Sequence, residues 1–377
     1  MAEVAAIRHI RLTDFRSYAS LNLELRGQPV VLSGPNGSGK TNLLEALSML
    51  SAGRGMRRAR LGEIARQNGR GGWTVTALLS GALDESQLGV GVEAGSPEKR
   101  VVRIDGASAP GPATLLEYLS FQWLTPAQDR LFMEGAAERR RFLDRMVLSH
   151  DPTHGKSAAT YEKAMRQRTK LLEDLPRADQ TLLGILERQM AEAGVAMAAA
   201  RREMTSRLAA GADQLNNAAF PAADLALEGA LEEALSVESA GDVEEAYEKR
   251  LKDGRWRDAA AGRALEGPHR SDLFVMHREK QQAARLCSTG EQKALLIGLV
   301  LANATAIAAN DSRVPLILLL DEVAAHLDAH RRAALFDILH ETGMQAFMTG
   351  TDADLFEAWG NRAEHLDVRD STISGSL

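Results

Sequence analysis

A lysine and a threonine follow the glycines of a glycine-rich run near the start of the chain. The run reads Gly34-Pro35-Asn36-Gly37-Ser38-Gly39-Lys40-Thr41-Asn42. Glycines let successive backbone amides face an anion, the lysine can pair with the β- and γ-phosphates of a nucleotide, and the threonine hydroxyl is a ligand for Mg²⁺. An ordinary glycine-rich turn needs neither the lysine nor the hydroxyl. The run therefore predicts a P-loop that binds ATP with Mg²⁺.

Two adjacent carboxylates late in the chain could complete a nucleotide site. Asp321 and Glu322 follow the apolar run of residues 315–320. Asp321 is a candidate Mg²⁺ ligand, directly or through water. Glu322 is the candidate catalytic residue, which would orient or deprotonate the attacking water. The alternative is a strand that happens to end in solvated acids, but with a P-loop upstream the pattern favours a Walker B motif.

A third motif precedes a second apolar segment. Ser288-Thr289-Gly290-Glu291-Gln292 stands before the apolar run of residues 294–301. Ser288 can cap a helix there, and Glu291 three residues later would complete a capping box. The same form is typical of the ABC-type signature motif, whose serine, glycine amide and helix dipole can bind a γ-phosphate. A capped buried helix and a γ-phosphate site both fit these residues.

Further candidates follow the carboxylates. Leu327 and Asp328 stand where a D-loop would lie, and Asp328 is also placed to cap the next helix. Thr349 or Thr351, at the end of an apolar run that begins at Ala346, is a candidate sensor of the γ-phosphate. We expect all of these side chains to gather at one end of a parallel sheet, where doubly wound folds bind ligands.

The remaining pattern indicates the elements that position these motifs. Alternating or fully apolar runs predict strands, at residues 7–12, 21–25, 29–33, 73–79, 89–93, 100–104, 273–276, 315–320 and 346–349. The run at 315–320 is apolar on both faces, as in a central parallel strand, whereas the short strands at 73–104 predict an antiparallel sheet. Residues 136–263 are rich in helix formers without a sustained heptad, so we predict a helical insertion and no long coiled coil.

These elements predict an α/β protein with an ABC-type P-loop ATPase head, built from a parallel core sheet and an antiparallel β subdomain, and an inserted helical arm. The predicted bounds are 1–135 for the N-terminal part of the head, 136–263 for the arm and 264–377 for the C-terminal part of the head.

Composition restricts the class of protein. The 377 residues carry a net charge of −6, with 45% hydrophobic and 25% charged residues, which is typical of a globular chain and excludes a nucleic-acid-coating polycation. The single cysteine, Cys287, excludes an internal disulfide framework and fits a reducing compartment. Charges interrupt the N-terminus too early for a signal peptide, and no segment is expected to reach membrane-spanning length. We predict a cytoplasmic protein without a membrane partner.

Clustered arginines are the candidates for binding DNA. Arg54, Arg57 and Arg58 follow the P-loop helix, and Arg139 and Arg140 open the helical region. Clustered cations can neutralise the phosphates of DNA or of ATP. A solvated charged loop fits the first cluster equally well.

Taken in order, these motifs resemble the RecF family, which are ABC-type ATPases of bacterial DNA repair related to the SMC proteins. The matching segments run nearly from end to end: Asp14-Phe15-Arg16-Ser17-Tyr18, residues 34–42, Gly53-Arg54, residues 139–144, Gly267-Pro268-His269-Arg270, residues 288–292, Asp321-Glu322 and Leu327-Asp328. The short arm distinguishes the chain from SMC relatives with very long coiled coils.

The resemblance implies how such a protein works. ATP would be held between the P-loop of one subunit and the signature, residues 288–292, of another, so that ATP induces a homodimer that clamps single-stranded, gapped or duplex DNA. Weak DNA-stimulated hydrolysis would reset it. The family acts with RecO and RecR at single-stranded gaps and stalled forks to promote RecA loading, and supports replication and the SOS response. Its Mg²⁺-side glutamine falls on Gln128, with Gln122 as the alternative, because residues 125–129 depart from the family's Pro-Glu-Asp form.

Two other classes of protein share some of these motifs. The ATPase subunit of an ABC transporter would carry both Walker motifs and the signature, but it needs no long helical insertion and would need a surface for a membrane partner. A nucleotide-dependent structural protein would bind ATP with negligible hydrolysis. The helical region at 136–263 argues against the transporter.

Overall fold

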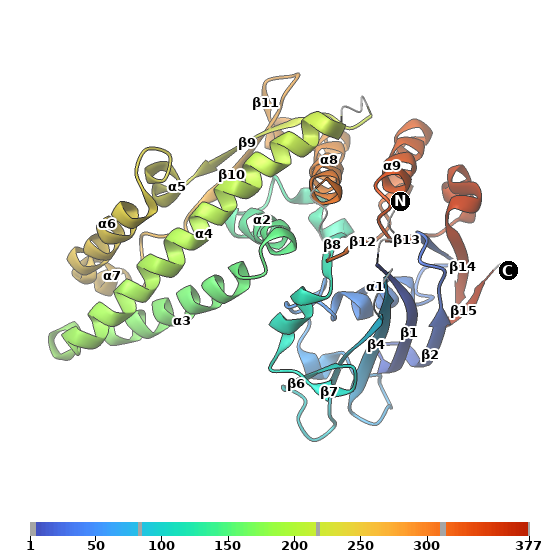
Figure 1. Ribbon diagram of the computed structural model, residues 1–377, viewed down its shortest axis with the longest axis horizontal. Helices are drawn as coiled ribbons and strands as arrows, with labels where there is room; N and C mark the ends of the chain where they lie inside the picture. Colours follow the sequence, from blue (N-terminus) through green and yellow to red (C-terminus); the bar gives the residue numbers. More distant parts are fainter. Residues whose placement is uncertain (1–4, 82–84, 216–218, 310–313, 376–377) are drawn as a thin grey trace. The chain divides into compact units, whose positions relative to one another are not determined.

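The computed structural model describes residues 5–81, 85–215, 219–309 and 314–375, and these form two compact units (Figure 1). The first unit consists of residues 1–129, 214–221 and 296–377, and the second of residues 130–213 and 222–295. The chain crosses between them several times, so neither unit is a continuous segment.

A six-stranded sheet in the first unit carries the ends of the predicted motifs. Its order is β15-β14-β3-β13-β12-β8. The strands are β3 (Val30–Ser33), β8 (Ser120–Leu124), β12 (Leu316–Leu320), β13 (Ala346–Gly350), β14 (Glu364–Arg369) and β15 (Thr372–Gly375). All pairs are parallel except β14 with β15. Every residue of β12 is buried between two parallel neighbours, which confirms the central strand predicted from its apolar run.

A second sheet of the first unit is antiparallel. Its order is β2-β1-β4-β5-β6-β7. The strands are β1 (Ala6–Phe15), β2 (Tyr18–Glu24), β4 (Trp73–Ser80), β5 (Glu85–Val92), β6 (Arg100–Ile104) and β7 (Ala107–Ser108). Successive residues of β4 alternate between buried and more exposed positions, as expected for a sheet that packs one face on the core.

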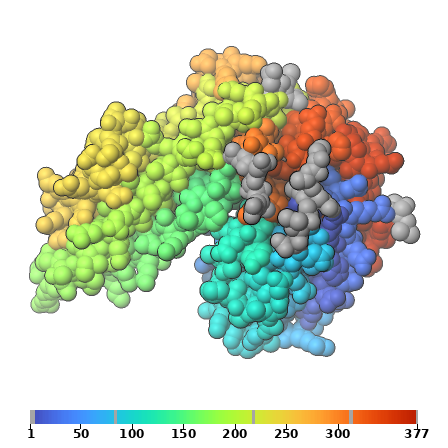
Figure 2. All heavy atoms as spheres, in the orientation of Figure 1, coloured from blue at the N-terminus to red at the C-terminus, as the bar shows by residue number. Residues whose placement is uncertain are grey.

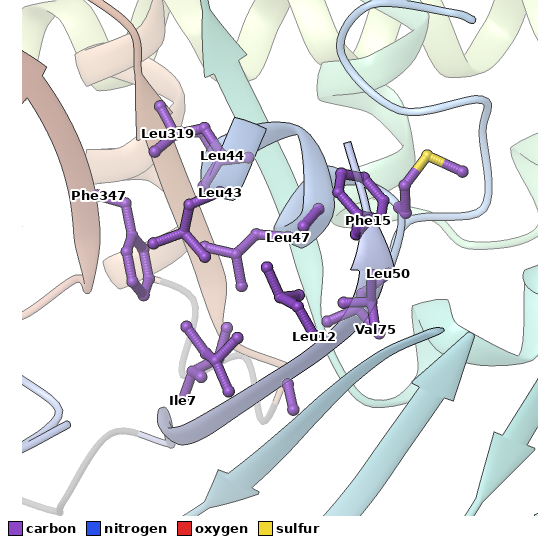
Figure 3. Close-up of a cluster of buried hydrophobic side chains, with 14 of the residues drawn as sticks. Ile7, Leu12, Phe15, Leu43, Leu44, Leu47, Leu50, Val75, Leu319 and Phe347 are labelled. Carbon is purple, nitrogen blue, oxygen red and sulfur yellow. The ribbon is translucent and has the colours of Figure 1, made fainter. Parts of the chain in front are cut away.

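The helix that follows the P-loop joins the two sheets into one core. In α1 (Lys40–Ser48), Leu43, Leu44 and Leu47 are completely buried. They belong to one cluster with side chains of both sheets, among them Ile7 and Leu12 from β1, Val75 from β4, Leu319 from β12 and Phe347 from β13 (Figure 3). The position of the P-loop is therefore fixed by packing on both sides of α1.

The first unit also holds the end of α8 (Thr289–Ala308) and α9 (Ala329–Glu341), with short 3₁₀ turns at Pro126–Arg130, Ala324–His326 and Ala353–Arg362. Among the described residues, α8 is long and apolar enough to cross a membrane, judged by length and composition alone. Of its most apolar 18-residue stretch, 83% is buried inside the fold. The expectation that no segment reaches this length was wrong. Burial accounts for the composition of α8, because a helix in a protein core is apolar all round.

The second unit contains most of the helices. They are α2 (Ala136–His150), α3 (His154–Leu172), α4 (Gln180–Leu215), α5 (Ala230–Ala234), α6 (Ala240–Asp253) and α7 (Arg255–Ala261). A core cluster unites α3, α4 and α6 through Tyr161, Met190 and Tyr247. Arg168 of α3 is buried among these helices and donates to Glu187 and Asp258 at 3.0 and 2.6 Å. Each of these carboxylates therefore has a cationic partner.

A small sheet accompanies these helices, and the sequence pattern did not predict all of it. Strand β10 (Asp272–His277), which was predicted, pairs with β9 (Ala223–Glu228) and β11 (Gln282–Ala283). Strand β9 lies inside the segment predicted to be helical. Its pairing with β10 draws residues 264–295, predicted as part of the head, into the second unit. The compact units thus differ from the predicted bounds at 135/136 and 263/264.

Candidate nucleotide-binding site

The glycine-rich run adopts a conformation that only its glycines allow at low cost. Between β3 and α1, Gly34, Gly37 and Gly39 have φ values of +146°, +80° and +114°. A Cβ at Gly34 would clash with the carbonyl oxygen of Val368, whereas nothing lies within 4 Å of a Cβ placed at Gly37. The loop is thus closely packed at its start and open at its tip. An open loop of this kind, followed by a helix N-terminus, can hold phosphates.

Two contacts from distant parts of the chain support the loop. Tyr18, at the start of β2, is fully buried and its hydroxyl donates to the carbonyl of Gly39 at 3.1 Å. The amide of Ser371, in the turn between β14 and β15, donates to the carbonyl of Ser38 at 2.8 Å. Sequence reasoning missed Ser371, since no local pattern links a C-terminal turn to a loop 333 residues earlier. Tyr18 serves as the aromatic anchor of its turn.

Lys40 points back over the loop. Its ammonium donates to the carbonyls of Gly34 and Pro35 at 2.6 and 2.8 Å. Burial lowers the pKa of Lys40, and the negative charges of Glu322 and Asp321 partly oppose this shift. The lysine therefore lies within electrostatic reach of both candidate carboxylates, at the place where a phosphate would meet it.

The P-loop and the second carboxylate motif meet through Thr41. Its hydroxyl donates to Asp321 Oδ1 at 2.9 Å, across 280 positions of the sequence. Thr349 at the end of β13 donates to the same oxygen at 2.8 Å. A hydroxyl and a carboxylate oxygen are hard donors that suit Mg²⁺, which needs few protein ligands when phosphates supply the rest. Among the described residues, no group of three or more His, Cys, Asp or Glu side chains could hold a metal ion.

Glu322 is held in an unusual backbone conformation. Its φ is +55°, in the left-handed region that glutamate rarely adopts. Its amide donates to Thr349 Oγ1 at 2.9 Å, so one buried hydroxyl binds both members of the carboxylate pair. Strain of this kind persists only where neighbouring groups enforce it, and such positions cluster at functional sites.

The two threonines that the sequence left as alternatives are now distinct. Thr349 is completely buried and bonded to Asp321 and Glu322, whereas Thr351 is exposed and its hydroxyl donates to Asp352 at 3.3 Å. Sequence reasoning offered both as sensors of a phosphate and missed the bridging contact of Thr349, which depends on the register of β13 beside β12.

The two candidate glutamines also differ in environment. Gln122 lies in the middle of β8, completely buried, and its amide group forms no hydrogen bond with any described residue. Gln128 follows the strand and accepts a bond from the amide of Thr125 at 3.2 Å. Since the amide of Asp321 donates to Leu124 at the end of β8, the turn holding Gln128 starts beside the carboxylate pair.

The signature segment begins α8, within the second unit. The amide and hydroxyl of Ser288 both donate to Glu291 Oε2 at 2.9 Å, and the amide of Glu291 approaches Ser288 Oγ at 3.4 Å. The predicted capping box is thus confirmed. Ser288, Thr289 and Gly290 are exposed, while Gln292 is buried and donates to the carbonyl of Cys287. The exposed three are accessible to another molecule.

Of the proposed D-loop, Leu327 is buried and Asp328 is exposed at the start of α9. Asp328 accepts the amide of Arg331 at 2.8 Å, which confirms its predicted capping role.

The five candidate DNA-binding arginines have different surroundings. Arg54 and Arg58 are exposed and form no side-chain hydrogen bond with any described residue, whereas Arg57 donates to Asn42 and Glu45 at 3.0 and 3.1 Å. Arg139 forms a two-pronged ion pair with Asp272 at 2.7 and 2.6 Å, and Arg140 donates to the carbonyl of Ser271. These last two arginines therefore have structural partners, which the sequence pattern did not reveal.

Arg100 fixes the loop that carries the first arginines. It reaches from β6 and donates to the carbonyl oxygens of Met49, Ser51 and Gly53, just beyond α1. Burial lowers the pKa of Arg100 to about 10. No motif indicated this residue, because its partners are backbone carbonyls of a distant turn.

Comparison with known proteins gives consistent matches over the whole chain. Residues 6–373 match the RecF/RecN/SMC N terminal domain family. The chain is 53% identical over 369 residues to the DNA replication and repair protein RecF of Mesorhizobium japonicum, covering 97% of each chain. It is 52% identical over 376 residues to the protein of the same name from Allorhizobium ampelinum, covering 99% of this chain and all of the other.

Solved structures share the fold. The recombination mediator protein RecF-ATP in the RecFOR pathway matches with a TM-score of 0.84 at 21% identity, covering 100% of this chain and 99% of that one. The Smc head domain of Pyrococcus furiosus, with an extended coiled coil and bound to the C-terminal domain of ScpA, matches with a TM-score of 0.55 at 15% identity, covering 99% of this chain and 96% of that one. These likenesses confirm the predicted fold class of an ABC-type ATPase head with parallel and antiparallel sheets.

Proposed function

Since the chain belongs to the RecF family, we propose that it is an ATP-switched DNA-binding protein of replication and repair, with weak DNA-stimulated ATPase activity. The observation that carries this proposal is the hydrogen bond between Thr41 and Asp321, because it unites the P-loop with the carboxylate pair. This contact supports a single site to which both motifs contribute.

The candidate site residues of the first unit each have a defined task in this proposal. The backbone amides of residues 34–42, except that of Pro35, which has no N–H, and the ammonium of Lys40 bind the phosphates of ATP. Thr41, Asp321 and the nearby Gln128 would hold Mg²⁺, which neutralises phosphate charge when bound. Glu322 orients or deprotonates the attacking water.

The signature supplies the second half of the site from another subunit. The exposed residues Ser288, Thr289 and Gly290 begin a long helix, whose N-terminus favours an anion. Glu291 and Gln292 hold this turn in shape, and Leu327 with Asp328 would lie at the same contact between subunits. ATP would thereby stabilise a homodimer, and hydrolysis would release it.

DNA would bind through its phosphates. Arg54 and Arg58 are the best candidates to bind DNA phosphates, because their side chains are exposed and have no hydrogen-bond partner among the described residues. Arg57 is also exposed and would contribute beside its ion pair with Glu45. Arg139 and Arg140, which are bonded to Asp272 and Ser271, would act indirectly by shaping the surface.

The relatives' name supports a role in replication and repair, and the solved RecF structure is described within the RecFOR pathway. From the resemblance to the family, we also propose for this chain action with RecO and RecR, RecA loading, SOS induction and a cytoplasmic location.

The test is the mass of the protein in solution with ATP and Mg²⁺, with ADP, and with ATP plus gapped DNA. We expect a dimer only with ATP, and no dimer with Lys40→Met, which removes the phosphate contact. Glu322→Gln should bind ATP, lose turnover and accumulate as the dimer. Equal turnover in Glu322→Gln and the unsubstituted protein would contradict the catalytic role. A mass indifferent to nucleotide would contradict the shared site and leave an ATP-binding protein with another task.

A further inference from the structure

A lysine outside every motif contacts the signature. Lys280 lies in the turn between β10 and β11, which projects at the surface of the second unit (orange in Figure 2). Its ammonium donates to Glu291 Oε1, and half of its side chain is exposed. The opposite oxygen of the same carboxylate, Oε2, accepts both bonds from Ser288. One carboxylate thus links Lys280 to the serine.

The contact matters because the Ser288 hydroxyl is already in use. The hydroxyl donates to Glu291 Oε2, with 2.9 Å between the two oxygens, and accepts from the amide of Glu291. A serine that donates to a phosphate must first release this carboxylate. The strength of the Ser288–Glu291 bond therefore sets how readily the serine can turn toward a nucleotide.

The negative charge of Glu291 is a second obstacle to a phosphate that approaches Ser288. The hydrogen bonds from Lys280 and then from Ser288 hold the pKa of Glu291 at about 2, so this side chain is an anion at neutral pH. An anion at the signature repels a phosphate, and a cation beside it cancels the repulsion. Lys280 supplies that cation from a different element of the fold.

We propose that Lys280 is a positioning residue of the signature, which neutralises Glu291 and loosens its hold on Ser288 so that the serine can donate to the phosphate of a second subunit. This inference rests on the proposed function. Lys280 acts through Glu291 and lies outside the phosphate-binding motif itself.

The test compares Lys280→Met with Lys249→Met, which removes another exposed charge, from α6 of the same unit. The measurements are the dissociation constant of the ATP-induced dimer and the affinity of the monomer for ATP. Losing one charge near a phosphate should weaken each site by about three- to tenfold, and the dimer constant by about 10- to 100-fold, because a symmetric dimer contains the contact twice. Monomer affinity for ATP should not change. Lys280→Arg should restore dimerisation, and high salt should shrink the effect.

A double variant isolates the route of action. In a Glu291→Gln background there is no charge to neutralise, so adding Lys280→Met should change the dimer constant by less than about twofold. Dimerisation of Lys280→Met equal to that of Lys249→Met would overturn the inference while leaving the proposed function intact. An undiminished effect in the Glu291→Gln background would also overturn it. If the unsubstituted protein does not dimerise with ATP, the proposed function fails and this inference falls with it.

Discussion

The hydroxyl of Thr349 offers the sharpest test of how the site is held together. It donates to Asp321 Oδ1 at 2.8 Å and accepts the amide of Glu322 at 2.9 Å, with no exposure to solvent. Thr349→Val keeps the volume but removes both bonds. It leaves the partly buried amide of Glu322 without a partner and deprives Asp321 of one of its two side-chain donors among the described residues.

The expected cost follows from these two losses. A buried group left unpaired costs about 1–3 kcal/mol, and a hydrogen bond to a charged acceptor contributes about 1.5–3 kcal/mol. Since the two losses overlap, Thr349→Val should lower the free energy of unfolding by about 2–4 kcal/mol, measured by urea denaturation. The turnover number of the ATPase should fall more than the affinity for ATP, because the Glu322 backbone loses the bond that holds its left-handed conformation.

Thr351→Val is the matched control. Thr351 stands two residues later and is exposed, so removing its hydroxyl should change the free energy of unfolding by less than about 0.5 kcal/mol. Thr349→Ser keeps a hydroxyl and should preserve most of the turnover. Equal losses in Thr349→Val and Thr351→Val would refute the bridging role. Faster hydrogen exchange at the Glu322 amide in Thr349→Val alone would support it.

Two other contacts lead to predictions. Arg100→Ala leaves three carbonyls without their donor and should lower the free energy of unfolding by about 3 kcal/mol in urea denaturation, whereas Arg103→Ala, an exposed arginine of the same strand, should change it by less than about 0.5 kcal/mol. Burial would raise the pKa of Asp144, but hydrogen bonds from His154 and Arg201 outweigh it and lower the pKa from 3.8 to about 2. The lowered pKa contributes about 2 kcal/mol to the free energy of unfolding; this contribution is complete above pH 3.8 and is lost as the pH falls toward 2. Asp144→Asn should therefore flatten the pH dependence of the free energy of unfolding between these pH values. An unchanged slope would contradict the assignment.

Motifs that act through local geometry could be read from the sequence. The P-loop needs glycines at fixed offsets from Lys40, and the capping box needs Ser288 three residues before Glu291. The strand before Asp321 was recognisable because burial on both faces demands an unbroken apolar run. These features were predictable since neighbours in the chain determine them.

Contacts between distant segments were not predictable from one sequence. Strand β9 was missed because it lies in a helix-rich segment and owes its extended form to pairing with β10. Lys280 contacts the signature and Ser371 contacts the P-loop, each from a turn whose sequence carries no functional pattern. The partners of Arg139 were hidden for the same reason: its cationic cluster predicted a phosphate contact, whereas the fold places Asp272 opposite it.

The backbone at Glu322 ties the energetics of the fold to its chemistry. Glycine would adopt a φ of +55° without the steric cost that a side chain incurs, which is about 1–2 kcal/mol. Stability alone would therefore favour glycine at this position. A glutamate stands there instead, its amide bonded by a buried threonine that also binds the neighbouring aspartate. The strained backbone at this position therefore supports the catalytic role that we propose for the Glu322 carboxylate.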